Sequence, residues 1–109
     1  MTDRAALEAE WLDLTRSRLP ALSAARDWPV SADHCFQRIL LDHATGGVWY
    51  DAIEGRPAYR AASLDVLSRA VALGQRVEAG EEPLAPLNRQ SLDWRGKRGP
   101  GRARRRPSA

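Results

Sequence analysis

Apolar side chains recur along this chain at helical spacing, three or four residues apart, rather than at every second position. In residues 3–18, Leu7, Trp11 and Leu14 follow the i, i+4, i+7 pattern that places side chains on one helix face. Proline suits the first turn of a helix but not its interior. Pro20 therefore predicts that this first helix ends before it and that a short second helix begins there.

A third helix is predicted over residues 32–44. Ser31 is a favourable N-cap residue, and Phe36, Ile39 and Leu40 share the face that we expect to turn toward the core. The two glycines that follow are expected to end this helix, because glycine is common just beyond a helix C-terminus.

Two more helices are predicted in the second half of the chain. Ser63 is a good N-cap for a helix over residues 64–79, and Gly74 lies on its apolar stripe, which indicates the close approach of another backbone. A proline-containing loop leads to a last helix over about residues 86–95. The aromatic stretch 48–53 fits either one helical turn or an extended segment.

This series of helices predicts the fold class. No alternating pattern typical of a strand is sustained along the chain. We therefore predict an all-α fold, a small irregular bundle of four or five short helices over residues 1–95. A length of 109 residues gives room for one small domain. Its four tryptophans are expected to bury much of the apolar area in so small a core.

Charge divides the chain into an acidic body and a basic end. Residues 1–94 carry ten arginines and fourteen acidic residues, whereas residues 95–109 carry seven basic residues and no acid. Segment 96–109 has no large apolar side chain to offset the entropy lost on ordering, so we predict a disordered basic tail. This tail is a candidate for binding nucleic-acid phosphates or an acidic protein, and its plainer role is that of a solubilising terminus. The candidate nucleic-acid residues are Arg95, Lys97, Arg98, Arg102, Arg104, Arg105 and Arg106.

Other features of the composition narrow the choice of chemistry. No aromatic residue interleaves with the basic residues of the tail, so the sequence does not indicate stacking on bases. The single cysteine, Cys35, fits a reducing, cytoplasmic location, and its place beside Phe36 predicts an inert buried thiol. One cysteine and two histidines make a structural zinc site improbable, and His43 is expected to be a hydrogen-bonded core histidine. No apolar run is long enough to span a membrane, so we expect no membrane partner.

Side chains able to bind or catalyse are densest in residues 33–60. On a helix, His34, Arg38 and Asp42 recur at i, i+4 and i+8, so we expect a polar stripe that faces away from the core. This stripe and the residues after it predict a face that binds a protein partner or a small anion. Arginines would hold the anionic group, and an aromatic ring would pack on a flat ligand. The candidate residues are His34, Arg38, Asp42, Trp49, Tyr50, Asp51, Arg56, Tyr59 and Arg60.

Other interpretations of the same residues stay open. Arg38 and Asp42 have the spacing of a surface ion pair, and the two large aromatic residues of stretch 48–53 have the size of core residues. A third interpretation pairs His34 with Asp42 or Asp51 for acid–base chemistry. The sequence has no dinucleotide, metal or Ser-His-Asp motif, so we assign no catalytic residue, metal ligand or cofactor.

A set of short runs stands out in the body of the chain: His34–Asp42, Gly47–Asp51, Arg56–Tyr59, Leu87–Leu92 and Trp94–Arg95. They resemble a family of short, uncharacterised bacterial proteins, some of which are labelled GNAT-type (GCN-five-related) N-acetyltransferases. The resemblance covers about residues 10–98. That label implies a mixed α/β fold that binds acetyl-coenzyme A through a strand, an Arg/Gln-x-x-Gly-x-Gly/Ala turn and a helix. The sequence has neither this turn nor the strands, so the resemblance assigns no catalytic or coenzyme residue.

The function that these observations favour is that of a small intracellular binding or adaptor module without evident catalytic machinery. Two alternatives come from other classes. Acetyltransferase activity is implied by the resemblance alone, and nucleic-acid binding is suggested by the basic tail.

Overall fold

The computed structural model describes residues 3–96, which form helices joined by turns. In chain order the elements are α1 (Arg4–Asp13), the π-helical turn η1 (Leu14–Arg18), α2 (Leu19–Arg26), α3 (Asp33–Thr45), the 3-10 turn η2 (Trp49–Asp51), α4 (Ala58–Ala61), α5 (Leu64–Glu78) and α6 (Leu84–Trp94). No strand occurs in this part of the chain, which confirms the predicted all-α bundle. The predicted tail lies outside the described residues, apart from Gly96.

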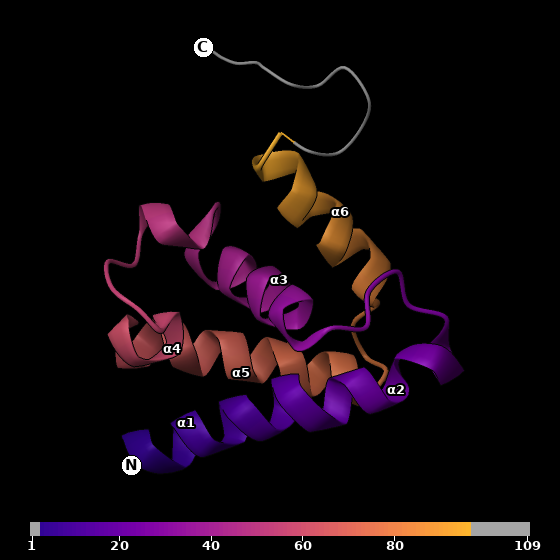
Figure 1. Ribbon diagram of the computed structural model, residues 1–109, viewed down its shortest axis with the longest axis horizontal. Helices are drawn as coiled ribbons and strands as arrows, with labels where there is room; N and C mark the ends of the chain where they lie inside the picture. Colours follow the sequence, from indigo (N-terminus) through magenta and orange to yellow (C-terminus); the bar gives the residue numbers. More distant parts are fainter. Residues whose placement is uncertain (1–2, 97–109) are drawn as a thin grey trace.

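The chain begins the fold with one long helical rod formed by α1, η1 and α2 (Figure 1). The predicted short helix with Pro20 in its first turn is confirmed as α2. The predicted break before it is wrong, because Arg18 and Leu19 keep helical backbone angles there. Proline has no N–H, and its ring clashes with the carbonyl four residues earlier in a regular helix. The wider turn η1, in which the Leu19 N–H donates to the Leu14 carbonyl, lets the rod continue with Pro20 at the start of α2.

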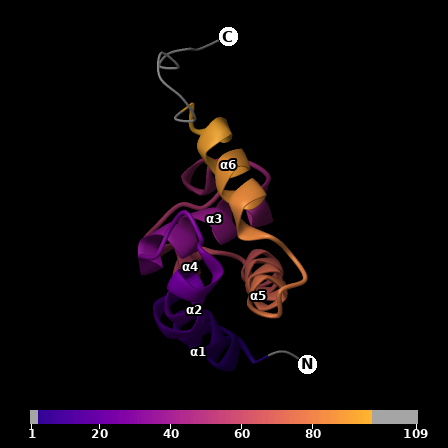
Figure 2. The ribbon, with the colours of Figure 1, turned by 90° about the vertical axis from the view of Figure 1, so that its right-hand side faces the viewer.

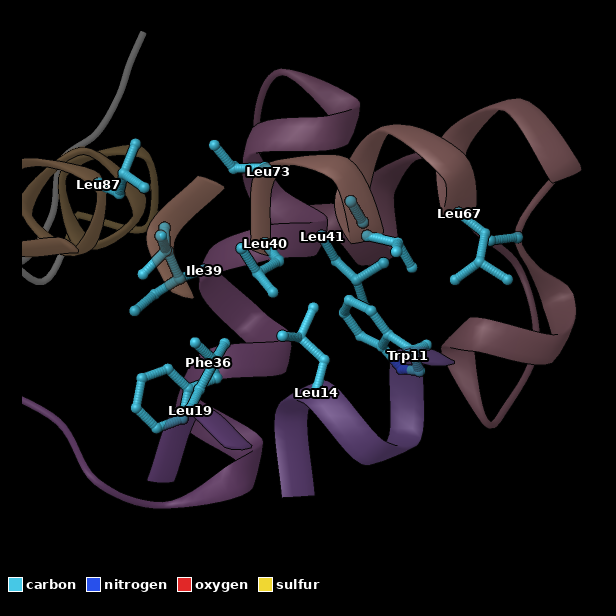
Figure 3. Packing of buried hydrophobic residues seen from close by; sticks show 14 of the residues in the cluster. Trp11, Leu14, Leu19, Phe36, Ile39, Leu40, Leu41, Leu67, Leu73 and Leu87 are labelled. Carbon is cyan, nitrogen blue, oxygen red and sulfur yellow. The ribbon is translucent and has the colours of Figure 1, made fainter. Parts of the chain in front are cut away.

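Helices α3 and α5 lie against this rod and against each other, and α6 packs on α3 (Figures 1 and 2). The apolar faces predicted from helical spacing meet in one core, built mainly from leucine and other aliphatic side chains (Figure 3). Its largest fully buried side chains are Trp11, Phe36, Leu14, Leu19, Ile39, Leu40, Leu67 and Leu84.

The tryptophans contribute less to this core than predicted. Trp11 is fully buried, but Trp28 and Trp49 are only half-buried and pack against the edge of the core. Trp94 stays 37% exposed at the end of α6. The core therefore depends on one tryptophan and many leucines, and the other large rings are left near the surface.

One of the two predicted N-cap residues is confirmed by the structure and the other is not. Ser63 is the N-cap of α5, where its hydroxyl accepts a hydrogen bond from the Val66 N–H at 3.1 Å. Ser31 is not the N-cap of α3, because that helix begins one residue later and its N-cap Ala32 offers no side-chain acceptor. The stretch 48–53 contains the 3-10 turn η2, and the one-turn helix α4 was not predicted.

Arginine side chains close the C-terminal ends of three helices. Arg4 donates to three carbonyls at the end of α4, and Arg26 donates to the Val77 and Glu78 carbonyls at the end of α5. Arg69 donates to a carbonyl at the end of α3. These last carbonyls of a helix have no partner within it and carry partial negative charge, so a guanidinium both satisfies and neutralises them.

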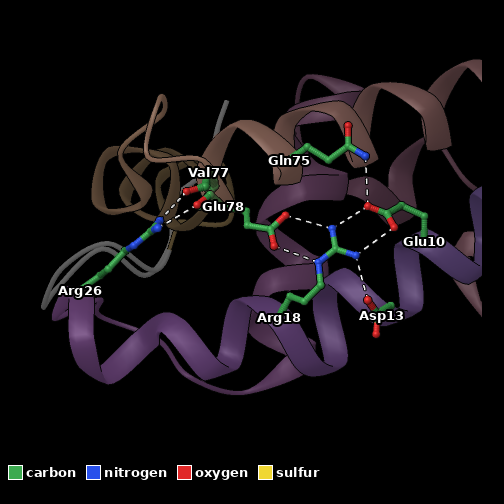
Figure 4. A network of polar contacts seen from close by, with 7 residues as sticks. All are labelled: Glu10, Asp13, Arg18, Arg26, Gln75, Val77 and Glu78. Carbon is green, nitrogen blue, oxygen red and sulfur yellow. Dashed lines mark hydrogen bonds and ion pairs between the residues drawn. The ribbon is translucent and has the colours of Figure 1, made fainter.

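A cluster of charged side chains joins the rod to α5 (Figure 4). Arg18 donates to both carboxylate oxygens of Glu10, at 2.9 and 2.6 Å, and to those of Glu78 at 2.9 and 3.0 Å. It also donates to Asp13, while Gln75 donates to Glu10. The hydrogen bonds from Arg18 are the main reason why the pKa of Glu10 is lowered to about 2.

Gly74 lies where α5 packs tightly against η1 of the rod and against α3. A Cβ atom at this position would lie 2.4 Å from Leu14 Cδ2 and 3.0 Å from Leu40 Cδ1. Gly74 is therefore tightly packed, but the predicted approach of another backbone is wrong, because the atoms that a Cβ would meet belong to buried side chains of the core.

We expect Gly74→Ala to lower the free energy of unfolding by about 1–2 kcal/mol. The overlap with the buried side chains of Leu14 and Leu40 costs about 2–3 kcal/mol, the upper part of the range for overpacking, and the better helix propensity of alanine returns about 1 kcal/mol. Urea unfolding followed by circular dichroism measures the change. Gly47→Ala is the matched control, because a Cβ there meets nothing within 4 Å. Equal stability of the two variants would contradict the close packing.

We expect acid to weaken the Arg18 cluster through Glu10. Because the folded-state pKa of about 2 lies below the ordinary 4.5, the stabilisation is complete above pH 4.5 and is lost as the pH falls toward 2. Glu10→Gln should lower the free energy of unfolding at pH 7 by about 1 kcal/mol, since the cluster is partly solvated. The variant should then lose less stability than the wild type between pH 5 and pH 2.5, measured by urea unfolding. Parallel losses in both proteins would show that Arg18 does not hold this carboxylate.

Candidate functional site

Asp42 is a fully buried carboxylate that joins three parts of the fold. It accepts hydrogen bonds from the Trp49 backbone N–H at 3.0 Å, from the Ser91 hydroxyl at 2.6 Å, and from Arg95 at 2.8 and 2.9 Å. The predicted position of Asp42 on an outward polar stripe is therefore wrong. Helix α6 covers this side of α3, and its polar side chains supply the hydrogen bonds that a buried carboxylate requires.

Arg95 is the partner that neutralises Asp42. Its side chain is only 12% exposed, and the hydrogen bonds to Asp42 raise the pKa of Arg95 above its ordinary value. The prediction that Arg95 is a free cation of the basic tail is wrong, because its charge is already paired within the fold. Its guanidinium also lies over the ring of Tyr50, 5.3 Å from the ring centroid.

Arg38 turns toward α6 rather than toward Asp42. Its two terminal nitrogens donate to the Ser91 hydroxyl at 2.7 Å and to the side-chain carbonyl of Asn88 at 2.8 Å. The surface ion pair between Arg38 and Asp42 is therefore wrong, and Ser91 links the two instead. Within residues 3–96, Arg38 makes hydrogen bonds to neutral groups and no ion pair of its own.

A pocket of about 550 Å³ opens beside Arg38, between the first half of α3, η2 and the start of α4. Its lining residues are His34, Gln37, Arg38, Leu41, Trp49, Arg56, Pro57 and Ala58. Four of the nine residues predicted for the binding face, His34, Arg38, Trp49 and Arg56, thus lie around one cavity. Among the described residues that line the pocket are two arginines, Arg38 and Arg56, and one histidine, His34, but no acidic residue.

The segment 54–58 places Arg56 at the pocket rim. A cis peptide bond joins Arg56 to Pro57, and the guanidinium of Arg56 lies 5.4 Å from the ring centroid of Trp49. Trp49 itself is half-buried and packs against the core, so its ring gives the pocket a fixed wall. Arg56 is exposed and makes no hydrogen bond or ion pair with another side chain of residues 3–96.

The other predicted residues of the face lie away from the pocket. Tyr50 is 53% exposed and contacts Arg95, so its interpretation as a core aromatic is wrong. Asp51 and Arg60 are exposed. Tyr59 is half-buried against the core and does not line the cavity.

The contacts and burial of the two histidines and the cysteine test what the sequence predicted for them. The carboxylate near His34 is that of Asp33, at 3.8 Å. The predicted pair of His34 with Asp42 is wrong because Asp42 is buried, and no ion pair joins His34 to exposed Asp51 within residues 3–96. His43 hydrogen-bonds the Leu87 carbonyl at 2.9 Å, as expected of a core histidine. Cys35 is half-buried rather than fully buried.

Three polar residues of the site were not predicted. Gln37 lines the pocket and donates to Thr15 of the rod. Gln37 follows His34 by three residues on the same helix, so helical spacing alone would place both side chains on one face. Asn88 and Ser91 orient Arg38 from α6, about fifty residues away in the chain, and no local pattern identifies such partners.

Within residues 3–96 no group of three histidine, cysteine or acidic side chains is placed to hold a metal ion. None of the described helices has the length and apolar character needed to cross a membrane.

We expect Asp42→Asn to destabilise the protein by about 3 kcal/mol, because it leaves the nearly buried Arg95 without its counter-ion. Urea unfolding measures the change. Asp51→Asn, which alters an exposed carboxylate in the same region, should stay within about 0.5 kcal/mol of the wild type. A loss below about 1 kcal/mol for Asp42→Asn would mean that the network around it is not what holds α6 to α3.

Comparison with protein-family models, with curated proteins and with solved structures finds no match for the chain. Residues 3–96 also contain no strand, so the strand–turn–helix element implied by the resemblance to acetyltransferases has no counterpart in them. The function is therefore argued from the geometry of the pocket.

Proposed function

We propose that the protein is a small binding module whose pocket holds an organic anion, a carboxylate or phosphate carried on a flat apolar group. The observation that carries this proposal is the state of Arg38. Its guanidinium is half-buried, is held in a fixed direction by two neutral acceptors, and lines a cavity without an ion-pair partner among residues 3–96.

The charge balance at the pocket supports an anionic ligand. Arg38 and Arg95 share one buried carboxylate, Asp42, with Ser91 as the link, so this network keeps one excess positive charge. Arg56 adds a second positive charge at the rim. A ligand carboxylate or phosphate would neutralise this excess, and planar guanidinium groups bind such anions through pairs of hydrogen bonds.

The remaining walls of the pocket favour an apolar body on that anion. Leu41, Pro57 and Ala58 supply aliphatic surface, and Trp49 supplies a large ring. A volume of about 550 Å³ lies in the range of small-molecule sites. A fixed guanidinium beside an apolar wall suits a ligand with an anionic group at one end and a flat apolar group at the other.

The same observations support a binding function over catalysis. The pocket has donors that fix a ligand, but the carboxylate near His34 is that of Asp33, which is solvent-exposed, lies 3.8 Å away and does not line the pocket. We place the protein in the cytoplasm, since its single half-buried thiol suits a reducing compartment. Acetyltransferase activity stays an alternative suggested by the sequence resemblance alone.

We expect 2-naphthoate and 2-naphthyl phosphate to bind the pocket and uncharged 2-naphthylmethanol to bind at least tenfold more weakly. Two-dimensional NMR titration, read at the Trp49 indole N–H and the Arg38 Nε–H, measures both affinity and place. Arg56→Ala should weaken the two anions about tenfold, since a hydrogen bond to a charged group contributes about 1.5–3 kcal/mol.

Arg60→Ala is the matched control, because Arg60 is an exposed arginine four residues later that does not line the pocket. Arg38→Lys keeps the positive charge but removes the planar fork, and it should also weaken both anions. The proposal fails if the neutral alcohol binds as tightly as the anions, if Arg60→Ala has the effect of Arg56→Ala, or if the Trp49 and Arg38 signals do not move.

A further inference from the structure

We propose that a second cavity, which shares no lining residue with the pocket, binds a free amino acid with an apolar side chain. This α5 cavity has a volume of about 430 Å³ and lies where the end of α3, one face of α5 and the chain leading into α6 meet. Arg76 binds the carboxylate of the ligand, and Glu82 binds its ammonium group. The lining residues are His43, Ala44, Arg69, Ala72, Leu73, Arg76, Glu82 and Leu87.

One face of α5 forms a wall of the α5 cavity. Arg69, Leu73 and Arg76 follow one another at intervals of four and three residues, so they lie on the same side of that helix. Arg69 is held there by an ion pair with Asp65 and by its hydrogen bond to the Ala44 carbonyl at 3.0 Å. The charge of Arg69 is therefore already balanced within the fold.

The hydrophobic core is thinly covered at this cavity. Leu73 and Leu87, which are 8% and 9% exposed, are the least buried members of the core cluster, and both line the cavity. His43 joins α3 to α6 on this side through its hydrogen bond to the Leu87 carbonyl at 2.9 Å. An aliphatic group placed in the cavity would cover the two leucines and remove apolar surface from water.

A turn after α5 brings the backbone of Glu82 beside that of Arg76. Gly80 has a positive φ of 82°. The Arg76 carbonyl then accepts hydrogen bonds from the N–H groups of Glu81 at 2.9 Å and of Glu82 at 3.3 Å. The turn therefore returns a half-buried acidic residue to the last turn of α5, where Arg76 also lines the cavity.

Arg76 and Glu82 supply opposite charges to the cavity without neutralising each other. Within residues 3–96, neither side chain makes an ion pair or a side-chain hydrogen bond. A half-buried carboxylate without such a partner has lost part of its water and gained nothing in return. Because the charge of Arg69 is balanced by Asp65, the cavity presents one free positive and one free negative charge. A ligand that carries both charges matches this pair better than an anion or a cation does.

A free α-amino acid matches both the charges and the apolar wall. Its carboxylate can accept a pair of hydrogen bonds from the Arg76 guanidinium, and its ammonium group can donate to Glu82. Since both charged groups are attached to one carbon atom, the side chain of the ligand is left to lie on Leu73 and Leu87. A residue inside a peptide has neither charge on its backbone, so the cavity should distinguish a free amino acid from a chain segment. The cavity volume lies in the range of small-molecule sites.

The test uses the isotope-labelled full chain and L-leucine as the probe. Two-dimensional NMR titration, read at the backbone N–H signals of Ala72, Leu73 and Leu87, measures both affinity and place. We expect these signals to shift with L-leucine at about 10 mM, a concentration that fills most of a site of millimolar affinity. Leucinamide lacks the carboxylate, and N-acetyl-L-leucine lacks the ammonium group. Each should bind about tenfold more weakly, because it loses one hydrogen-bonded charge pair.

Two variants assign each charge of the ligand to its partner. Glu82→Gln should weaken L-leucine about tenfold without weakening N-acetyl-L-leucine, which has no ammonium group to lose. Arg76→Gln should weaken L-leucine to a similar extent without weakening leucinamide, which has no carboxylate. Glu81→Gln and Arg89→Gln are the matched controls, because both side chains are exposed and neither lines the cavity. Both control variants should bind L-leucine like the wild type.

Three results would overturn the proposal. One is the absence of shifts at the three signals when L-leucine is added. Another is an equal affinity for L-leucine and for either derivative, which would leave apolar contact as the only attraction. The third is an effect of Glu81→Gln as large as that of Glu82→Gln. Arg56→Ala alters the pocket but not the α5 cavity and should bind L-leucine like the wild type, so the two sites are tested independently.

Discussion

The buried carboxylate of Asp42 is the interaction on which the second half of the structure depends. An ionised group without contact to water must receive hydrogen bonds and a counter-charge, or the fold becomes unstable. Asp42 obtains them from η2, from Ser91 of α6 and from Arg95. The apolar contacts between α3 and α6 bring the helices together. The carboxylate then holds the start of the 3-10 turn and the residue that follows α6, and so it positions Trp49, which lines the pocket.

Several arginines of residues 3–96 stabilise the fold itself. Arg18 donates hydrogen bonds to three carboxylates, two on the rod and one on α5. Arg4, Arg26 and Arg69 donate to carbonyls at the C-terminal ends of other helices. These charges are therefore not available to a polyanion, although they raise the arginine content of the sequence. Among the arginines of residues 3–96 that have no carboxylate partner, Arg56 and the half-buried Arg38 stand out because both line the pocket.

The local sequence pattern is sufficient to predict those features of a helix that depend on its own residues. It identified the apolar faces, the N-cap Ser63 and the tight packing at Gly74, because these depend on residues a few positions apart. It failed where the environment comes from far along the chain. Asp42 was assigned to the surface because a carboxylate is normally solvated, and nothing near it in sequence showed that Ser91 and Arg95 would cover it. Arg95 was assigned to the tail for the same reason. The sequence predicts part of the pocket, because His34 and Arg38 share a helix face. It does not predict the direction of the Arg38 side chain, which depends on hydrogen bonds to Asn88 and Ser91 of α6.

The proposed pocket and the fold share a support. Arg38 reaches Asp42 through Ser91, so the direction of its guanidinium depends on hydrogen bonds that lead to a fully buried carboxylate. A change to Asp42 itself would therefore disturb the pocket and the fold together, and it cannot distinguish a loss of binding from a loss of stability. Arg56 can, because its side chain is exposed and makes no hydrogen bond or ion pair with another side chain of residues 3–96. The proposed binding is therefore best tested at the rim of the pocket, where a change leaves the buried carboxylate and its partners intact.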